Sequence, residues 1–469
     1  QAVSAYGSGL NRTPHIDRLA REGVVFERAY CGNSICAPSR ASFLTGLHAH
    51  AHGKRTNLDR FDGSQPTFVT RLRAAGYTTA LIGKWHLQCE PQGFDHWQVL
   101  PGQGSYYNPD FVSPEGRTRH TGYVTDVTTD LALAWIRSRE GEDGPFLLLC
   151  HHKAPHRTWA PGPAHLHDLD GEDLPEPPSL FDDYKGRNSL LPNNEMTIAR
   201  HLMDDYDLKL AGSTRPDALG RRFVNPELAR MTPEQRKAWD AAYGPRNASY
   251  DPASLTPEEN VRWKYQRYVK DYLRCVASVD DGVGRLLDHL DTSGLASDTM
   301  VIYASDQGFF LGEHGMYDKR WMYEESFRLP LLVRWPGTAK PGTRVRALVQ
   351  NIDLAPTLLE AAGVDVPASL HGASLVPLLG GEVPASWRHA LYYHYYEVGE
   401  HAVPRHEGVR TDRHKLVRYY DTDELELFDL ERDPSEMRSR HAEPAYADVR
   451  RDLQTELGRL RVRYAVPSP

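Results

Sequence analysis

The chain has 469 residues and a formal net charge of −8, with 40% hydrophobic and 25% charged residues. This composition is typical of a soluble globular protein, and the length suits one large α/β domain with an appendage. The acidic balance argues against a general nucleic-acid binder, and no apolar run reaches the ~18 residues of a membrane-spanning helix.

Helical and extended patterns alternate along the first 360 residues. An apolar stripe or capping residue marks each helix, and a short apolar run marks each strand. This alternation predicts a large, mostly parallel, doubly wound sheet flanked by helices. The predicted helices cover residues 14–22, 68–75, 123–139, 262–290 and 352–362, and the predicted strands cover residues 24–26, 77–82, 146–150, 299–305 and 329–334.

Two regions depart from the alternation. Residues 161–260 are rich in Pro and charged residues, and we interpret them as an extended surface insertion, either a wall of the substrate site or a solvated loop region. Residues 384–469 combine three strand-like runs with a closing helix at 446–464. We therefore predict a catalytic domain at 1–383 and a small C-terminal α+β subdomain with an antiparallel sheet at 384–469.

The cysteines and the first residue give weaker information. Five cysteines are an odd number without close spacing, so a dense disulfide framework is excluded. The sequence opens at Gln1 without an initiator Met or a signal-peptide pattern. We expect the natural start to lie elsewhere, and we favour a periplasmic or secreted location over a cytoplasmic one.

Reactive side chains follow three of the predicted strands. The strand at 77–82 runs into GKWH (83–86), that at 146–150 into HHKAPH (151–156), and that at 299–305 into DQG (306–308). Ligands bind outside the carboxyl ends of the strands in open α/β sheets. Converging Lys, His and Asp side chains at this edge predict a catalytic site that handles an anion.

The segment CAPSRASFLTG at residues 36–46 is the most specific motif. Pro38 at a helix start leaves Cys36 just outside the helix N-terminus, where backbone N–H groups and the helix dipole favour an anion. Arg40 supplies a two-pronged donor for an oxyanion.

This segment resembles the signature of the formylglycine-dependent sulfatases, which belong to the alkaline-phosphatase-like superfamily. GKWH (83–86), APH (154–156), SDQG (305–308), GEHG (312–315) and ELFDLERDP (426–434) resemble further blocks of that family, in the same order. HHKAPHRTW (151–159) and YYHYYE (392–397) are most similar to sulfatases of glycosaminoglycan breakdown, the N-acetylglucosamine-6-O-sulfatases in particular.

The resemblance implies that a formylglycine-generating enzyme oxidises Cys36 to formylglycine. The aldehyde hydrate offers two hydroxyls: one attacks sulfur and expels the alcohol, and the other ejects sulfate and restores the aldehyde. The matching positions imply the other catalytic roles. Sulfate oxygens would be bound by cations, His86 would accept a proton during sulfate release, and His156 would be the general acid, assisted by Lys319. The cations are Arg40, Lys84 and Lys319.

The resemblance also implies one Ca²⁺ ion held by Asp306 and Gln307, whose oxygens are hard ligands. The family usually has Asn or His where Gln307 stands. Its first strand ends in a pair of Asp that complete the metal site, and this sequence opens just after that position. We expect that central strand and its Asp pair in the natural protein, because the neighbouring strands would otherwise stay unpaired.

The expected substrate is a 6-O-sulfated N-acetylglucosamine or glucosamine unit of a glycosaminoglycan. An aryl sulfate or a 2-O-sulfated uronate stays open, and a uronate would need an extra cation such as Arg157 or Arg405. Two other functions also stay open: a phosphonate or phosphate monoester hydrolase on the same scaffold, and a degenerate sulfated-glycan-binding protein. Candidates for lining the sugar pocket, for which ordinary packing roles are equally open, are Arg157, Trp159, His314, His371, His394, Arg405 and His406.

Overall fold

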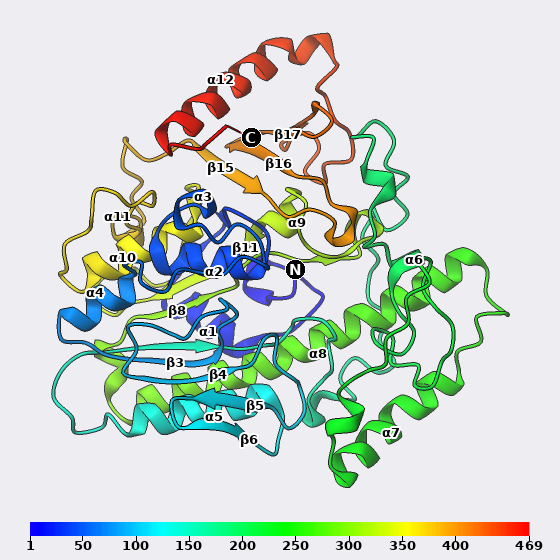
Figure 1. Cartoon of the computed structure of the whole chain (residues 1–469), viewed down its shortest axis with the longest axis horizontal. Coiled ribbons are helices and arrows are strands. Elements are labelled where there is room, and N and C mark those ends of the chain that lie inside the picture. The colour runs from blue at the N-terminus through cyan, green and yellow to red at the C-terminus, as the bar shows by residue number, and fades with distance from the viewer. Residues whose placement is uncertain (469) are drawn as a thin grey trace.

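The computed structural model describes residues 1–468. Its catalytic part is built on two mixed sheets with helices on both faces (Figure 1). The first has the order β6-β5-β4-β3-β7, in which β3 pairs in parallel with β4 and β7 while β5 and β6 are antiparallel. Its strands are β3 (Thr78–Lys84), β4 (His96–Leu100), β5 (Asp110–Ser113), β6 (Gly116–Arg119) and β7 (Phe146–His151).

The second sheet has the order β13-β1-β12-β8. β1 is parallel to β13, but β12 runs antiparallel to both of its neighbours. Strands from the same stretches of the chain form two smaller sheets, β11-β2-β14 and β10-β9. The strands are β1 (Val24–Phe26), β2 (Ala29–Tyr30), β8 (Val301–Ala304), β9 (Phe310–Leu311), β10 (Tyr317–Asp318), β11 (Arg328–Leu329), β12 (Leu331–Arg334), β13 (Thr343–Val345) and β14 (Val349–Gln350).

The predicted α/β class is confirmed, but the sheets are mixed and not mostly parallel. The prediction of one mostly parallel sheet is wrong because β8 and β12 are joined without a long crossover helix. The connection contains only α9 (Glu324–Phe327) and short strands. Parallel neighbours usually need a helical crossover, whereas antiparallel neighbours do not.

Side chains of β3 show how the helical layers form. Leu81 belongs to a core shared with α2, α4 and α10, whereas Ala80 and Ile82 pack against α5 on the opposite face. This alternation follows from the two-residue period of a strand. The helices of the catalytic part are α1 (Pro14–Glu22), α2 (Cys36–Thr45), α3 (Ala49–His52), α4 (Phe68–Ala74), α5 (Val124–Arg137), α6 (Ile198–His201), α7 (Pro233–Ala248), α8 (Pro257–Thr292), α10 (Leu354–Ala361) and α11 (Val376–Leu379).

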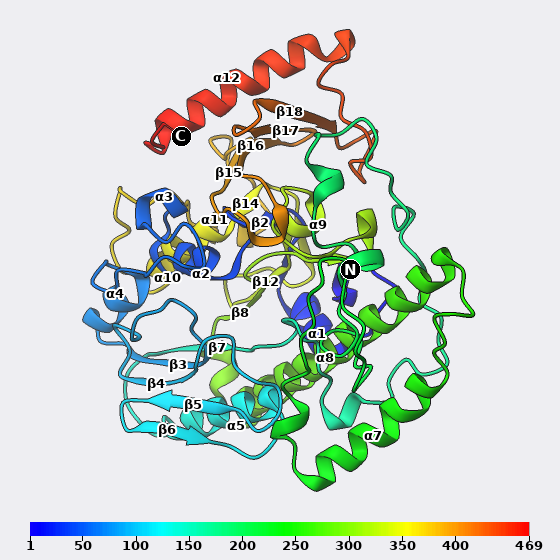
Figure 2. The same cartoon turned by 45° about the vertical axis from the view of Figure 1, so that its right-hand side comes forward.

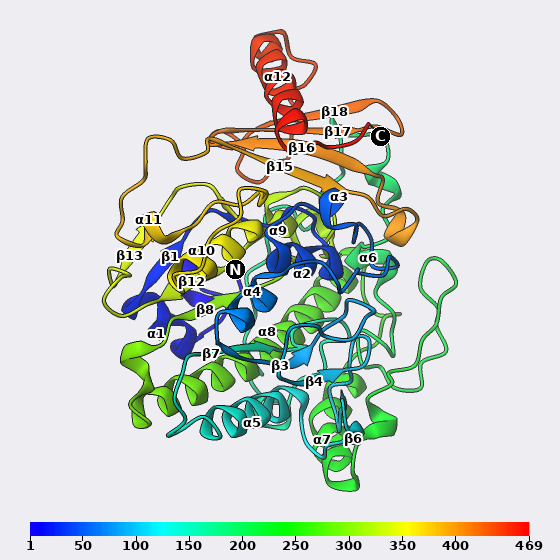
Figure 3. The same cartoon turned by 60° about the vertical axis from the view of Figure 1, so that its left-hand side comes forward.

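The C-terminal subdomain has the predicted antiparallel sheet. β15 (Ala390–Tyr395), β16 (His406–Thr411), β17 (His414–Tyr419) and β18 (Glu424–Asp429) form a meander, which α12 (Ala447–Arg463) covers on its outer face (Figures 2 and 3). Leucines of α12 pack on one face of this sheet, and side chains of the other face join the main core of the molecule. The subdomain is therefore attached to the catalytic part through apolar burial.

Residues 161–260 are mostly irregular, with short helical turns and α7 (Figure 1). They are not a detached loop, because Leu191, Trp239 and Tyr243 are buried in the main core. The segment thus forms a packed wall against α8.

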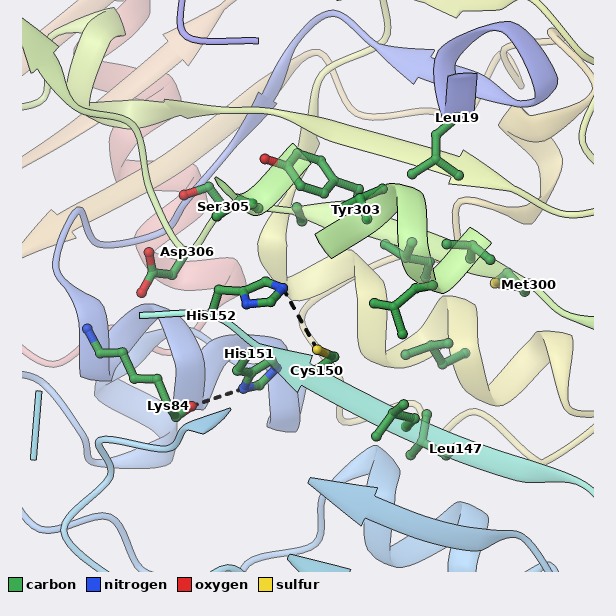
Figure 4. A pocket seen from close by; sticks show the side chains of 18 of the residues that line it. Leu19, Lys84, Leu147, Cys150, His151, His152, Met300, Tyr303, Ser305 and Asp306 are labelled. Atoms are coloured by element: carbon green, nitrogen blue, oxygen red, sulfur yellow. Dashed lines mark hydrogen bonds between the residues drawn. The ribbon is translucent and has the colours of Figure 1, made fainter. Parts of the chain in front are cut away.

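A cavity of about 740 Å³ separates the two sheets. β7 and β8 are the last strands of their sheets, and all of their side chains are only half-buried. The cavity is lined by both strands, by α8 and by α10. Lys84 and Asp306 lie at one end of it, and Leu147 and Met300 lie at the other (Figure 4). The expected central strand would precede Gln1 and stays a prediction.

A buried carboxyl under the C-terminal sheet should contribute stability that falls as pH rises. Glu436 is fully buried, and its Oε1 lies 2.7 Å from Lys415 Nζ. Burial raises the pKa of Glu436 to about 7; Lys415 lowers it and the neighbouring Glu324 raises it. The folded state therefore holds this proton more tightly than the unfolded chain, whose Glu pKa is about 4.3. The stabilisation that Glu436 contributes is fully present below about pH 4 and is lost between about pH 4 and pH 7.

We expect Glu436 alone to contribute a decrease of up to about 3 kcal/mol in the free energy of unfolding over this range. Urea unfolding at pH 5 and pH 8 measures it, with Glu436→Gln expected to show a smaller decrease. An equal decrease in both proteins would contradict the assignment.

Candidate active site

Cys36 is the first residue of α2, immediately after the extended residue Ile35, so the helix begins before the expected Pro38 and includes Cys36 in its first turn. The side chain is buried, and Sγ lies 4.0 Å from Nε2 of Gln307, which follows β8. The N-terminal N–H groups of α2 have no intrahelical partners and carry a partial positive charge. An anionic group that replaces or contacts the thiol would be stabilised at this position.

Arg40 lies one helical turn after Cys36 and contacts both sheets. Its Nε lies 3.1 Å from Asp306 Oδ2, and Nη1 donates to the carbonyl oxygen of Lys84 at 2.8 Å. Nη1 also lies 3.2 Å from Nδ1 of His151. These contacts fix the guanidinium at the edge of the cavity, beside Cys36.

Lys84 ends β3, and its ammonium is buried, which lowers the pKa of Lys84. Gly83 makes this placement possible because a Cβ there would lie 2.0 Å from the His151 carbonyl oxygen, and its φ is +105°. His86 follows two residues later in a left-handed conformation, φ 60°. Burial lowers the pKa of His86 to about 3, with Lys84 and Arg40 contributing. His86 is therefore neutral at pH 7.

The segment after β7 carries the second histidine. His156 lines the cavity, and its Nδ1 lies 2.7 Å from the carbonyl oxygen of Arg157. Tyr106 supports it by donating from its hydroxyl to the His156 carbonyl oxygen at 2.5 Å. Burial lowers the pKa of His156 well below its ordinary value, and Lys84 and Lys319 lower it further.

Asp306 and Gln307 follow β8 at the same end of the cavity. Although burial alone would raise it, the pKa of Asp306 is lowered by Arg40, Lys84 and Lys319. Oε1 of Gln307 is buried without a hydrogen-bond partner. A carboxylate next to an unpartnered amide oxygen fits a hard divalent cation such as Ca²⁺. The two residues therefore fit the expected ion, and they would provide part of its oxygen ligands.

Lys319 completes the cationic set, and its neighbours are functional candidates that our sequence analysis missed. Lys319 Nζ lies 2.9 Å from Asp318 Oδ1, and Asp318 Oδ2 lies 3.4 Å from Nη1 of Arg320 and 3.2 Å from Nε2 of His401. Asp318 and Arg320 both have positive φ and are buried. Buried charges in rare backbone conformations concentrate at functional sites. The run of charged residues DKR at 318–320 was the sequence feature that could have identified them.

The structure places three predicted pocket residues in the packed interior, which corrects the expectation that they line a sugar pocket. Trp159 is fully buried, with its ring centroid 4.6 Å from that of Tyr268. His314 is fully buried, and its Nδ1 lies 2.8 Å from Asp182 Oδ2. His406 is enclosed by aromatic rings of the C-terminal sheet. Each of these side chains is buried against partners that are distant in the sequence or belong to neighbouring strands.

The other four also have structural partners. Arg157 makes two hydrogen bonds to Asp207, at 2.7 and 2.5 Å, and Arg405 pairs with Asp421. His371 lies against His48, His50 and Tyr464 beneath α12. His394 stacks on Tyr396 with ring centroids 3.6 Å apart. None of these seven candidates lines the cavity.

The chain matches known proteins over its whole length. The sulfatase family model matches residues 1–364, and the model of the C-terminal part of N-sulphoglucosamine sulphohydrolase matches residues 312–463. The chain is 45% identical to the N-acetylglucosamine-6-O-sulfatase of Bacteroides thetaiotaomicron, covering 100% of this chain and 85% of that protein. Identity to the human (Homo sapiens) N-acetylglucosamine-6-sulfatase is 28%, covering 81% of this chain and 63% of that protein.

Comparison with solved structures also finds similarity over the whole chain. One determined in complex with its substrate D-glucosamine-2-N,6-O-disulfate superposes with a TM-score of 0.96 at 44% identity, covering 100% of this chain and 96% of that one. A phosphonate monoester hydrolase from Silicibacter pomeroyi gives 0.71 at 23% identity, covering 99% and 93% respectively, which shows a shared fold only. Together with the family model over residues 1–364, the 45% identity shows that this chain belongs to the sulfatase family and is a sulfuric ester hydrolase.

Proposed function

We propose that this sulfatase hydrolyses the 6-O-sulfate ester of an N-acetylglucosamine or glucosamine unit of a glycosaminoglycan. The observation that carries the chemistry is the convergence of Cys36, Arg40, Lys84 and Lys319 at one end of the cavity. The full-length similarity to an N-acetylglucosamine-6-O-sulfatase supports the substrate class.

Cys36 is the residue that a maturation enzyme would convert to formylglycine, so Sγ marks where the hydrate oxygens would lie. That group supplies one hydroxyl to attack sulfur and a second to expel sulfate. α2 orients it, since Cys36 is fixed at the helix N-terminus beside Arg40 and Gln307.

Three cations in this chain would hold the sulfate. Arg40 is anchored by the Lys84 carbonyl, whereas Lys84 and Lys319 are both buried. Fixed cations in a site that excludes water stabilise the charge that develops on sulfate oxygens in the transition state. A bound Ca²⁺ on Asp306 and Gln307 would add a further positive charge for these oxygens.

The two histidines would move protons. His86 is neutral at pH 7, as a base requires. His156 is also neutral while the lysines around it are uncompensated. A bound sulfate ester would offset the charges of Lys84 and Lys319, which raises the pKa of His156 and lets it protonate the leaving oxygen.

Ion pairing favours an amino sugar over a uronate. A uronate needs a cation for its carboxylate, yet Arg157 and Arg405 are paired with Asp207 and Asp421.

Sulfate release from four substrates tests the proposal: N-acetylglucosamine-6-sulfate, N-sulfoglucosamine, a 2-O-sulfated unsaturated uronate disaccharide and an aryl sulfate. We expect the highest kcat/KM for the 6-O-sulfated amino sugar. A preference for the uronate would overturn the 6-O assignment and leave the sulfatase class intact. Turnover of an aryl phosphonate or phosphate above that of the aryl sulfate would favour the phosphonate hydrolase alternative.

A further inference from the structure

The loop after β4 brings a glutamine to His86. β3 and β4 are parallel, with Lys84 paired with Leu100, so the two strands end at the same level and their following loops are adjacent. His86 lies in the first loop and Gln103 in the second. Gln103 Nε2 is 3.1 Å from His86 Nε2.

The backbone of Gln103 is held in place by the segment that follows β7. The Nζ of the buried Lys153 donates to the Gln103 carbonyl oxygen at 3.1 Å, and it lies 4.6 Å above the centre of the Tyr106 ring. Tyr106 in turn donates to the His156 carbonyl oxygen. The Gln103 backbone is thus connected to the segment that carries His156.

Two buried atoms in this pair have no partner, Nδ1 of His86 and Oε1 of Gln103. The glutamine amide can present either its N–H₂ or its oxygen to the ring after a half-turn, so it can hold either neutral tautomer. If Nδ1 takes a proton, Nε2–H of the resulting imidazolium donates to the amide oxygen.

The charges that face His86 are mostly positive. Lys84, Arg40 and Lys54 disfavour its protonated form, and Asp306 opposes them. A carboxylate at position 103 would stabilise the imidazolium strongly, whereas a neutral amide adds no net charge. Glutamine therefore orients the ring and keeps it neutral between proton transfers.

We infer that Gln103 is a positioning residue for His86: it binds Nε2 and leaves Nδ1 for the reacting group. This inference rests on the proton-accepting role of His86 proposed above.

The test compares Gln103→Leu, Gln103→Glu and a matched control, Gln98→Leu, in the matured full-length enzyme. Gln98 makes the same kind of contact to a histidine on β4 that is outside the proposed catalytic set, with its Nε2 3.2 Å from Nε2 of His96. The readouts are kcat, KM, the pH profile and the ¹⁵N imidazole shifts of His86, which report its tautomer and pKa.

We expect Gln103→Leu to lower kcat by about 10²-fold with little change in KM, as for loss of positioned acid–base catalysis. Gln103→Glu should raise the pKa of His86 and move the acidic limb of the profile to higher pH. Gln98→Leu should change neither. Unchanged kcat and unchanged His86 shifts in both Gln103 variants would overturn the inference. Altered shifts with unchanged kcat would show that the contact exists but that His86 lacks the proposed catalytic role.

Discussion

Cys36→Ala is expected to reduce sulfate release to the background rate, a loss of at least about 10⁴-fold, as when a covalent nucleophile is removed. Alanine cannot be converted to an aldehyde, so no attacking oxygen can form. The matched control is Cys31→Ala, because Cys31 is equally buried but its Sγ contacts Ser34 and the Phe327 carbonyl. Activity of Cys36→Ala at the level of the control would exclude the mechanism.

Cys36→Ser gives a second, distinctive outcome. Serine keeps one hydroxyl for attack and lacks the second one that expels sulfate, so sulfated enzyme should accumulate. Intact-mass measurement after incubation with substrate detects the added sulfate. In the wild-type protein, the peptide that contains Cys36 should show the mass of the aldehyde in place of the thiol.

Asp306→Ala should lower turnover by at least about 100-fold, comparable to the removal of other groups that stabilise transition-state charge. The substitution removes the carboxylate that fits Ca²⁺ and that pairs with Arg40 at 3.1 Å. A readout independent of activity is the rise in melting temperature when Ca²⁺ is added to chelator-treated protein, since an ion that binds only the folded state stabilises it.

The matched control is Asp298→Ala, because Asp298 is an exposed carboxylate that precedes the start of β8. The wild type and this control should both show the rise in melting temperature. Asp306→Ala should not. If chelation leaves the melting temperature and turnover of the wild type unchanged, the metal proposal is wrong.

Much of the sheet could be predicted because its signals are local. The helical pattern of residues 14–22, the apolar run of β3 and the apolar stripe of α5 are short-range patterns, and the structure has elements at these places. The directions of β8 and β12 could not be predicted, since they depend on how the connection between them folds. The hairpin of β5 and β6 was also missed, because β6 is fully exposed and carries no apolar alternation.

The catalytic candidates could be placed because they follow strands. Lys84 ends β3, whereas His156 and Asp306 follow β7 and β8, and the parallel pairing of β3 and β7 brings two of these strand ends together. The pocket candidates could not be placed, since Trp159 and His314 look polar or amphipathic in the sequence and meet buried partners only in the tertiary structure. Gln103 has no sequence signal, because its role depends on the register of β3 and β4.

The guanidinium of Arg40 has a mechanical consequence. Arg40 contacts Asp306 on one sheet and the Lys84 carbonyl on the other. It therefore couples the residue that follows β8 to the end of β3, and a displacement of either segment is transmitted to the nucleophile one helical turn away.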